Sequence, residues 1–195
     1  MANSAFTKSS LPTPVSIANG GTASASAAAA IAALGGLPVA GGTMTGNITM
    51  GANTSTIYDT VLSVDGQYIG ITESGTAAAT LAFGDVCYFV AASSKWTLAK
   101  ADASATAGPV KIGICVLAAS GDAQPTRMML FGKIRADAKF PTLTIGAQVY
   151  ISAATAGLIV TAQPAATDNI IRVVGFGNTA DELYFNPSGD YIIHI

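Results

Sequence analysis

The side chains that could act in catalysis are few and scattered in this sequence. Histidine occurs once, at His194, and Asp181, Glu182 and Asp190 are the carboxylates nearest to it along the chain. A catalytic histidine needs a nucleophile and an orienting carboxylate, but the sequence has no Gly-x-Ser-x-Gly motif, cysteine–histidine pairing or histidine-rich metal spacing. Neighbouring strand residues point to opposite faces, so Asp181 and Glu182 make a poor acid–base pair. We expect these carboxylates to be solvated turn residues, and the protein to have no catalytic residue, cofactor or metal.

Binding chemistry is better represented than catalysis. Alternate positions place Lys133, Arg135, Asp137 and Lys139 on one face of an expected strand, which would suit an acidic protein surface or a glycan. The alternative is a solvated outer face that protects a sheet edge. Trp96 offers a ring for stacking on sugars, with a place in the core as the alternative. The same two interpretations apply to four tyrosines: Tyr88, Tyr150, Tyr184 and Tyr191.

The two cysteines, Cys87 and Cys115, lie inside apolar β-like runs. Buried thiols are common, so we expect both to be reduced and not joined in a disulfide. The N-terminus lacks the charged and apolar regions of a secretion signal, which favours assembly in a cytoplasm.

Composition limits the class of protein further. The 195 residues carry 9 basic and 11 acidic side chains, a net charge of −2, with 50% hydrophobic and only 10% charged residues. The basic residues are scattered, so we expect no nucleic-acid partner. The apolar runs are shorter than the roughly 20 residues that span a bilayer, so we expect no membrane insertion. An apolar composition without a membrane favours an oligomer.

The leading third of the chain is uncharged. From Ser9 to Tyr58 there is no Asp, Glu, Lys, Arg or His. Soluble surfaces normally carry charge, so this stretch is either disordered or covered by other chains, and we favour coverage.

Within this leading part we expect three elements. Residues 1–21 contain two prolines and predict an extended arm. Thr22 to Leu34 predicts a short Ala-rich helix, with a disordered linker as the alternative. The period-two pattern of residues 43–50 predicts a β stalk, so residues 22–75 form the trimerisation part. The small and apolar side chains expected at the trimer interface are Ala27, Ala30, Ile31, Leu34, Met44, Ile48 and Met50.

The remainder, residues 76–195, predicts a compact β-sandwich or barrel, because short apolar runs alternate with Gly, Pro, Asp and Ser clusters. Before it, Asp65-Gly66 predicts the turn of a hairpin, and residues 73–79 a domain boundary. The segments beginning at Gly84 and Gly146 share a tyrosine four residues on and a closing Ala-Ala, and each is followed by a basic residue that opens another strand. We infer two related halves of one barrel.

Three features in order resemble the shaft and connector sequences of tailed-bacteriophage fibre proteins: residues 14–22, the Ala-rich stretch ending at Leu34-Gly35, and residues 41–48. Residues 146–150, 172–175 and 183–188 are similar to the β-domains that close many phage tail fibres, head fibres and capsid decoration proteins. The fold class expected is therefore mainly β, with an extended arm, a short helix and trimeric stalk, and a C-terminal β domain.

The resemblance implies a homotrimeric virion structural protein, assembled in the host bacterial cytoplasm and bound to other virion proteins of capsid, collar or tail. The expected shaft is short, with one helix and a brief β stalk, whereas a host-binding tail fibre generally needs a long shaft. This favours a head fibre or capsid decoration protein over the alternative, a tail-fibre protein or adaptor that binds a host surface glycan or receptor. A third hypothesis, a fibre-borne glycan hydrolase, has the least support, because the sequence shows no catalytic motif. The side chains expected to attach the arm to the virion are Phe6, Leu11, Pro12, Pro14, Val15 and Ile17. Those expected at a binding surface are Lys133, Arg135, Lys139 and Trp96.

Overall fold

The structure, a computed structural model, describes residues 26, 29–30, 52–53, 55, 58 and 61–195. The chain divides into two units, Met1–Ser55 and Thr56–Ile195. In the first unit Ala29 and Ala30 are helical. The Ala29 amide donates to the Ser26 hydroxyl at 3.2 Å, and the Ala30 amide donates to the Ser26 carbonyl at 2.9 Å. A serine hydroxyl that accepts from an amide three residues later is typical of the first turn of a helix.

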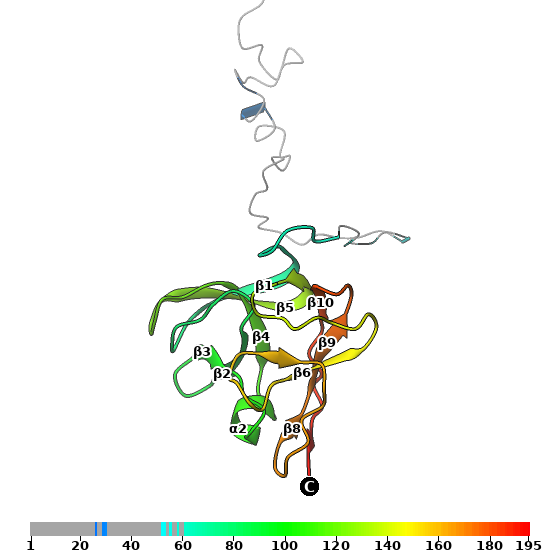
Figure 1. The fold of residues 1–195 in the computed structure, drawn as a ribbon. Helices are drawn as coiled ribbons and strands as arrows, with labels where there is room; N and C mark the ends of the chain where they lie inside the picture. Colours follow the sequence, from blue (N-terminus) through cyan, green and yellow to red (C-terminus); the bar gives the residue numbers. More distant parts are fainter. Residues whose placement is uncertain (1–25, 27–28, 31–51, 54, 56–57, 59–60) are drawn as a thin grey trace, which may run out of the picture. The chain divides into compact units, whose positions relative to one another are not determined.

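The second unit is mainly β (Figure 1). Its elements are β1 (Tyr68–Thr76), β2 (Val86–Val90), β3 (Lys95–Leu98), α2 (Ser104–Ala107), β4 (Ile112–Leu117), β5 (Pro125–Arg135), β6 (Gln148–Ile151), β7 (Ile159–Val160), β8 (Ile170–Ile171), β9 (Val173–Gly177), β10 (Glu182–Phe185) and β11 (Ile192–Ile193). Nine of the strands form one antiparallel sheet in the order β3-β2-β4-β5-β10-β9-β6-β7, with β1 paired to β5, and β8 pairs with β11. The large sheet curls into a half-barrel, so the β class of the sequence prediction is confirmed.

Counted outward from the central β5–β10 pair, the strands are β4, β2 and β3 on one side and β9, β6 and β7 on the other. Strands at equal distance from the centre are equivalent, because the sheet contains two related halves. In the first half the Gly84 amide donates to the Cys115 carbonyl at 2.8 Å, and in the second the Gly146 amide donates to the Gly177 carbonyl at 2.8 Å. Both Gly84 and Gly146 have positive φ, 86° and 76°, which glycine adopts without strain.

Strand pairing repeats in the same way. Cys87 lies opposite Gly113 across β2 and β4, and Val149 lies opposite Gly175 across β6 and β9. The second pair of strands contains a bulge between Val149 and Tyr150 that the first pair lacks. The prediction of two related halves is confirmed for these strands.

The predicted hairpin around Asp65-Gly66 is wrong in its pairing. The turn itself is present, with Gly66 at a φ of 81°, but residues 61–63 form no strand and β1 pairs along its length with β5. A hairpin pattern specifies a turn, whereas the partner strand is chosen by tertiary packing. Residues 68–75, which the sequence assigned to the stalk, therefore belong to the large sheet.

Two apolar clusters hold the sheet together. The larger lies inside the curl and takes residues from both halves, including Ile114, Met129, Val149 and Phe185. The smaller packs on the opposite face of the first half. Its buried members are Ala77, Leu81, Cys87, Trp96, Cys115, Ala119 and Met128. Alternate residues of β2 and β4 thus reach different clusters, because side chains alternate across a strand.

Candidate binding surfaces

Most residues predicted to attach the arm or form the trimer interface lie outside the described residues. These are Phe6, Leu11, Pro12, Pro14, Val15, Ile17, Ala27, Ile31, Leu34, Met44, Ile48 and Met50. Ala30 is described, and it is helical and half-buried.

The four alternating charged residues do not share one face. Lys133 and Arg135 are both on β5, but the strand ends at Arg135, so Asp137 and Lys139 lie in the turn beyond it. The Arg135 guanidinium binds the Asp137 carboxylate through two hydrogen bonds of 2.8 and 3.0 Å. Lys139 pairs with the buried Asp85 at 2.6 Å. The predicted basic face is therefore broken by the strand end, and two of its three cations are paired.

Trp96 is fully buried, so its prediction as a surface residue is corrected. Its ring packs edge-on against Phe89 with centroids 5.3 Å apart, and the Lys111 ammonium lies 5.5 Å from its centroid. Gly75 and Gly113 lie so close that an added Cβ would meet the indole at 2.7 and 3.3 Å. The core interpretation of this tryptophan is the right one.

The two adjacent carboxylates differ in environment. Asp181 is exposed, whereas Glu182 is fully buried, so its prediction as a solvated residue is wrong. Glu182 accepts a hydrogen bond from the Leu62 amide at 2.8 Å and another from the Asn178 side-chain amide. The sequence gives no signal for this burial, since a Glu at the start of a strand is ordinarily solvated.

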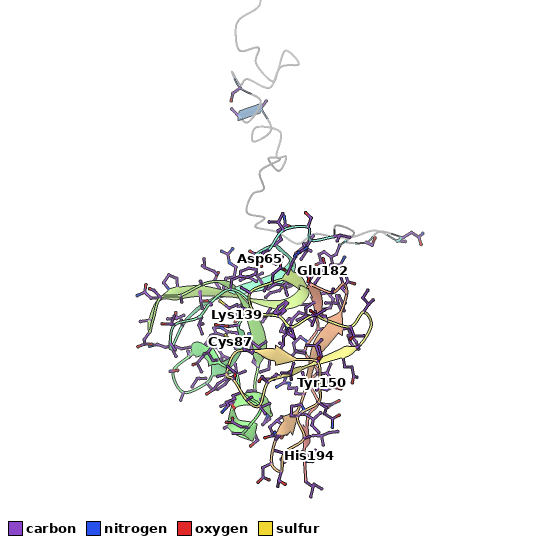
Figure 2. The ribbon with its side chains drawn as sticks, in the orientation of Figure 1. Asp65, Cys87, Lys139, Tyr150, Glu182 and His194 are labelled. Atoms are coloured by element: carbon purple, nitrogen blue, oxygen red, sulfur yellow. The ribbon has the colours of Figure 1, made fainter. Side chains whose placement is uncertain are left out.

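His194 lies far from these groups. Figure 2 shows it at the end of the domain opposite Asp65 and Glu182. Its backbone amide donates to Asn169 at 2.8 Å, beside the β8–β11 pair. Within the described part of the chain, no group of three or more His, Cys, Asp or Glu side chains is placed to hold a metal ion.

An exposed apolar row crosses the outer face of the sheet. Residues directly opposite one another on neighbouring strands place Lys133, Tyr184 and Phe176 side by side. The Phe131 ring packs edge-on against Tyr184 at 5.4 Å and lies 6.5 Å from the Tyr58 ring. Beyond this aromatic group, Ile71 lies opposite Phe131, and Ile71 and Phe176 are 57% and 37% exposed. We call the set Tyr58, Ile71, Phe131, Phe176 and Tyr184 the outer apolar row.

A separate groove of about 260 Å³ opens beside β6 and the end of the chain. Two half-buried tyrosines, Tyr150 and Tyr191, line it together with polar side chains, and Tyr150 is labelled in Figure 2. The Tyr150 hydroxyl donates to the Gln148 side-chain oxygen at 2.8 Å. The remaining lining residues are Gln163, Ile171, Val173, Ser188, Asp190 and Ile192.

Arg172 fixes one wall of this groove from behind. Its guanidinium is buried and donates to the Ser188 carbonyl at 2.9 Å and to the carbonyls of Ala107, Gly108 and Val110 at 3.2, 2.5 and 2.8 Å. Burial lowers the pKa of this guanidinium from its ordinary value. Arg172 thus ties the segment before Tyr191 to the α2 loop.

No helix in the described residues has the length and apolar character needed to cross a membrane. The chain matches no protein-family model and no curated protein.

Proposed function

We propose that this protein is a non-enzymatic structural protein of a tailed-bacteriophage virion, a homotrimeric short head fibre or capsid decoration protein. The N-terminal arm attaches to capsid or collar, residues 22–55 associate with two other copies, and the β domain projects outward. This structural role does not require the binding surface that the sequence predicted at Lys133, Arg135 and Lys139.

The observation that carries the proposal is the outer apolar row on the β domain. The uncharged run ends at Tyr58, and the Tyr58 ring lies against Phe131, where the outer apolar row begins. Exposed apolar surface of this extent favours association, at roughly 25 cal/mol for each Å² removed from water. Identical copies that associate through the outer apolar row would remove it from water.

Sedimentation equilibrium of the full chain tests the assembly. We expect a trimer that yields no folded monomer on dilution, because folding and association are linked. Ile31→Asp places a charge in the helix expected from the sequence, and Phe176→Lys places one on the outer apolar row; both should weaken the trimer. Ile195→Lys is the matched control, because Ile195 is fully exposed at the chain end. A folded, monodisperse monomer would refute the proposal.

Incorporation into particles tests the virion role. Deleting residues 2–20 should leave a soluble trimer that no longer joins the particle. Particles that still carry the shortened chain would show that the arm is not the attachment segment.

The second candidate is a tail-fibre protein or adaptor that binds a host surface glycan. The groove beside Tyr150 favours it, because aromatic rings and amides are the side chains that bind sugars. Labelling the protein on imaged particles separates the two candidates by location.

A further inference from the structure

We propose that the groove between Tyr150 and Tyr191 binds one ring of an uncharged sugar. This inference deepens the second candidate function, because it names the ligand class and the site. It does not depend on where the protein sits on a virion.

The two tyrosines supply the apolar part of the site. Each ring is half-buried, so one part is held by the protein while another remains open to the groove. The face of an aromatic ring carries partial negative charge, and the C–H groups on one side of a sugar ring carry partial positive charge. A sugar ring therefore packs on a tyrosine with both apolar and electrostatic gain.

The polar lining matches hydroxyl groups. A sugar hydroxyl both donates and accepts, and Gln148 and Gln163 can do the same through their amides, whereas the Asp190 carboxylate accepts only. The Gln148 side-chain oxygen already accepts from the Tyr150 hydroxyl at 2.8 Å. Its NH₂ group is thereby oriented as a donor beside the Tyr150 ring.

Charge selects among sugars. The described residues that line the groove include one carboxylate, Asp190, and no lysine or arginine. The nearby Arg172 donates to backbone carbonyls at the back of the wall. Sugars with carboxylate, phosphate or sulfate groups would meet the Asp190 charge without a lining cation, so uncharged sugars are favoured.

Hydrogen bonds hold the backbone that lines the groove in place. Arg172 holds the Ser188 carbonyl, and the Ser188 hydroxyl accepts from the Asp190 amide at 3.0 Å. In β6, the bulge between Val149 and Tyr150 changes the strand register at Tyr150. Bulges re-aim side chains next to functional sites. At about 260 Å³ the groove is smaller than most drug-sized pockets, which suits a single ring.

The internal repeat supplies a matched control. Tyr88 occupies in the first half the strand position that Tyr150 occupies in the second, but β2 and β4 have no bulge there. Tyr88 lines a different depression, whose described lining includes no amide or carboxylate side chain. A sugar site that needs the polar groups should therefore respond to Tyr150 and ignore Tyr88.

Saturation-transfer NMR on the full chain tests the proposal. The probes are the methyl glycosides of glucose, galactose, mannose and N-acetylglucosamine at millimolar concentration, with sialic acid and glucose 6-phosphate as charged comparisons. We expect at least one uncharged glycoside to receive saturation, and the charged sugars to receive less. Absence of transfer to all four glycosides would overturn the proposal.

Variants locate the binding. Tyr150→Ala should weaken the glycoside that binds by about tenfold, because it removes the stacking surface. Asp190→Asn, which keeps the shape, should weaken it by about threefold to tenfold. Tyr88→Ala should leave the affinity unchanged. Binding that survives both groove substitutions, or that is lost equally in Tyr88→Ala, would place the site elsewhere and refute the assignment.

The same samples are examined by sedimentation, so the two proposals fail separately. A trimer that binds none of the glycosides would refute the sugar site and leave the structural role intact. A sugar-binding monomer would do the reverse.

Discussion

The Glu182 carboxylate accepts a hydrogen bond from the Leu62 amide at 2.8 Å, although 120 residues separate them. Arg135, which lies opposite Glu182 on the neighbouring strand β5, donates to the Leu62 carbonyl at 3.3 Å. The Gly66 amide then donates to the Arg135 carbonyl at 3.1 Å. Glu182 and Arg135 therefore fasten the chain around Leu62 to the central strands of the sheet, at the end of the domain opposite His194 (Figure 2).

Replacing Glu182 by alanine should destabilise the β domain. The buried Leu62 amide and the Asn178 side chain would both lose their acceptor, and we expect the free energy of unfolding to fall by about 2–4 kcal/mol. Urea denaturation measures the change. Asp181→Ala is the control at the neighbouring residue. Asp181 is exposed, and its carboxylate lies 3.6 Å from the Arg135 guanidinium in a solvated ion pair, so the free energy of unfolding should fall by less than about 1 kcal/mol. Equal losses in the two variants would show that burial of Glu182 is unimportant.

Arg172 and Lys111 open equivalent strands of the two halves, but substituting them should have unequal effects. Arg172→Ala would remove the guanidinium donor from four backbone carbonyls, of which the Gly108 carbonyl keeps the Val110 amide, so we expect a loss of about 3 kcal/mol or more in the free energy of unfolding. Lys111 is exposed and pairs with Glu73 at 2.5 Å, so Lys111→Ala should cost about 1 kcal/mol or less. Thermal or urea unfolding compares the two. An Arg172→Ala protein as stable as Lys111→Ala would contradict the role given to the buried guanidinium.

A methyl group at Gly70 should prevent β1 from pairing correctly with β5. Gly70 lies opposite Gly132, and a Cβ on Gly70 would stand 2.1 Å from the Phe131 carbonyl oxygen, which is backbone and cannot swing aside. We expect Gly70→Ala to lower stability by about 3 kcal/mol or more, or to yield insoluble protein.

The control for this substitution is Gly121→Ala. An added Cβ there meets nothing within 4 Å, so the change in stability should stay within about 0.5 kcal/mol. A Gly70→Ala protein that unfolds at the wild-type urea concentration would show that β1 and β5 are not so closely packed.

Alkaline pH should weaken the fold through its two buried thiols. Burial, followed by the nearby Cys115 and Asp85, raises the pKa of Cys87 well above its ordinary value of 9.0, and burial also raises the pKa of Cys115. As the pH rises through about 9, the unfolded chain loses these protons while the folded chain keeps them. The free energy of unfolding therefore falls with pH above that point and is unaffected by these groups below it.

Urea unfolding from about pH 8 to about pH 10 measures this fall. A Cys87→Ala, Cys115→Ala double variant should be less stable at neutral pH, since it opens a cavity, but should lose less further stability as the pH rises. In the native protein, alkylation of either thiol should be slow until urea unfolds the chain. Rapid alkylation of native protein at neutral pH would contradict the burial of both cysteines.

The sequence predicted the β class, most strand positions and the internal repeat, because these depend on local patterns. Short apolar runs between Gly, Pro, Asp and Ser clusters predicted the strands of residues 76–195, and the shared glycine and tyrosine spacing predicted the two halves. A further sign of the repeat was available in Thr80-Leu81 and Thr142-Leu143, which precede the two glycines at the same distance.

None of these patterns predicts which polar side chains are buried. Glu182 and Arg172 are charged residues at strand ends, where solvent is the usual environment, and only the arrival of distant backbone groups makes their burial tolerable. Trp96 is the opposite case. An aromatic ring is a common part of a binding surface, but β1 and β4 cover the Trp96 ring and bury it.

The sequence by itself determined the uncharged leading third, the alternating strands and the repeated glycines, because each is a property of neighbouring residues. Only the tertiary structure decided that β1 pairs with β5 and that the strand face ends at Arg135. It also brought Tyr150 and Tyr191 together in one groove. These relationships join residues far apart in the chain, and they depend on which surfaces pack best once all strands are present.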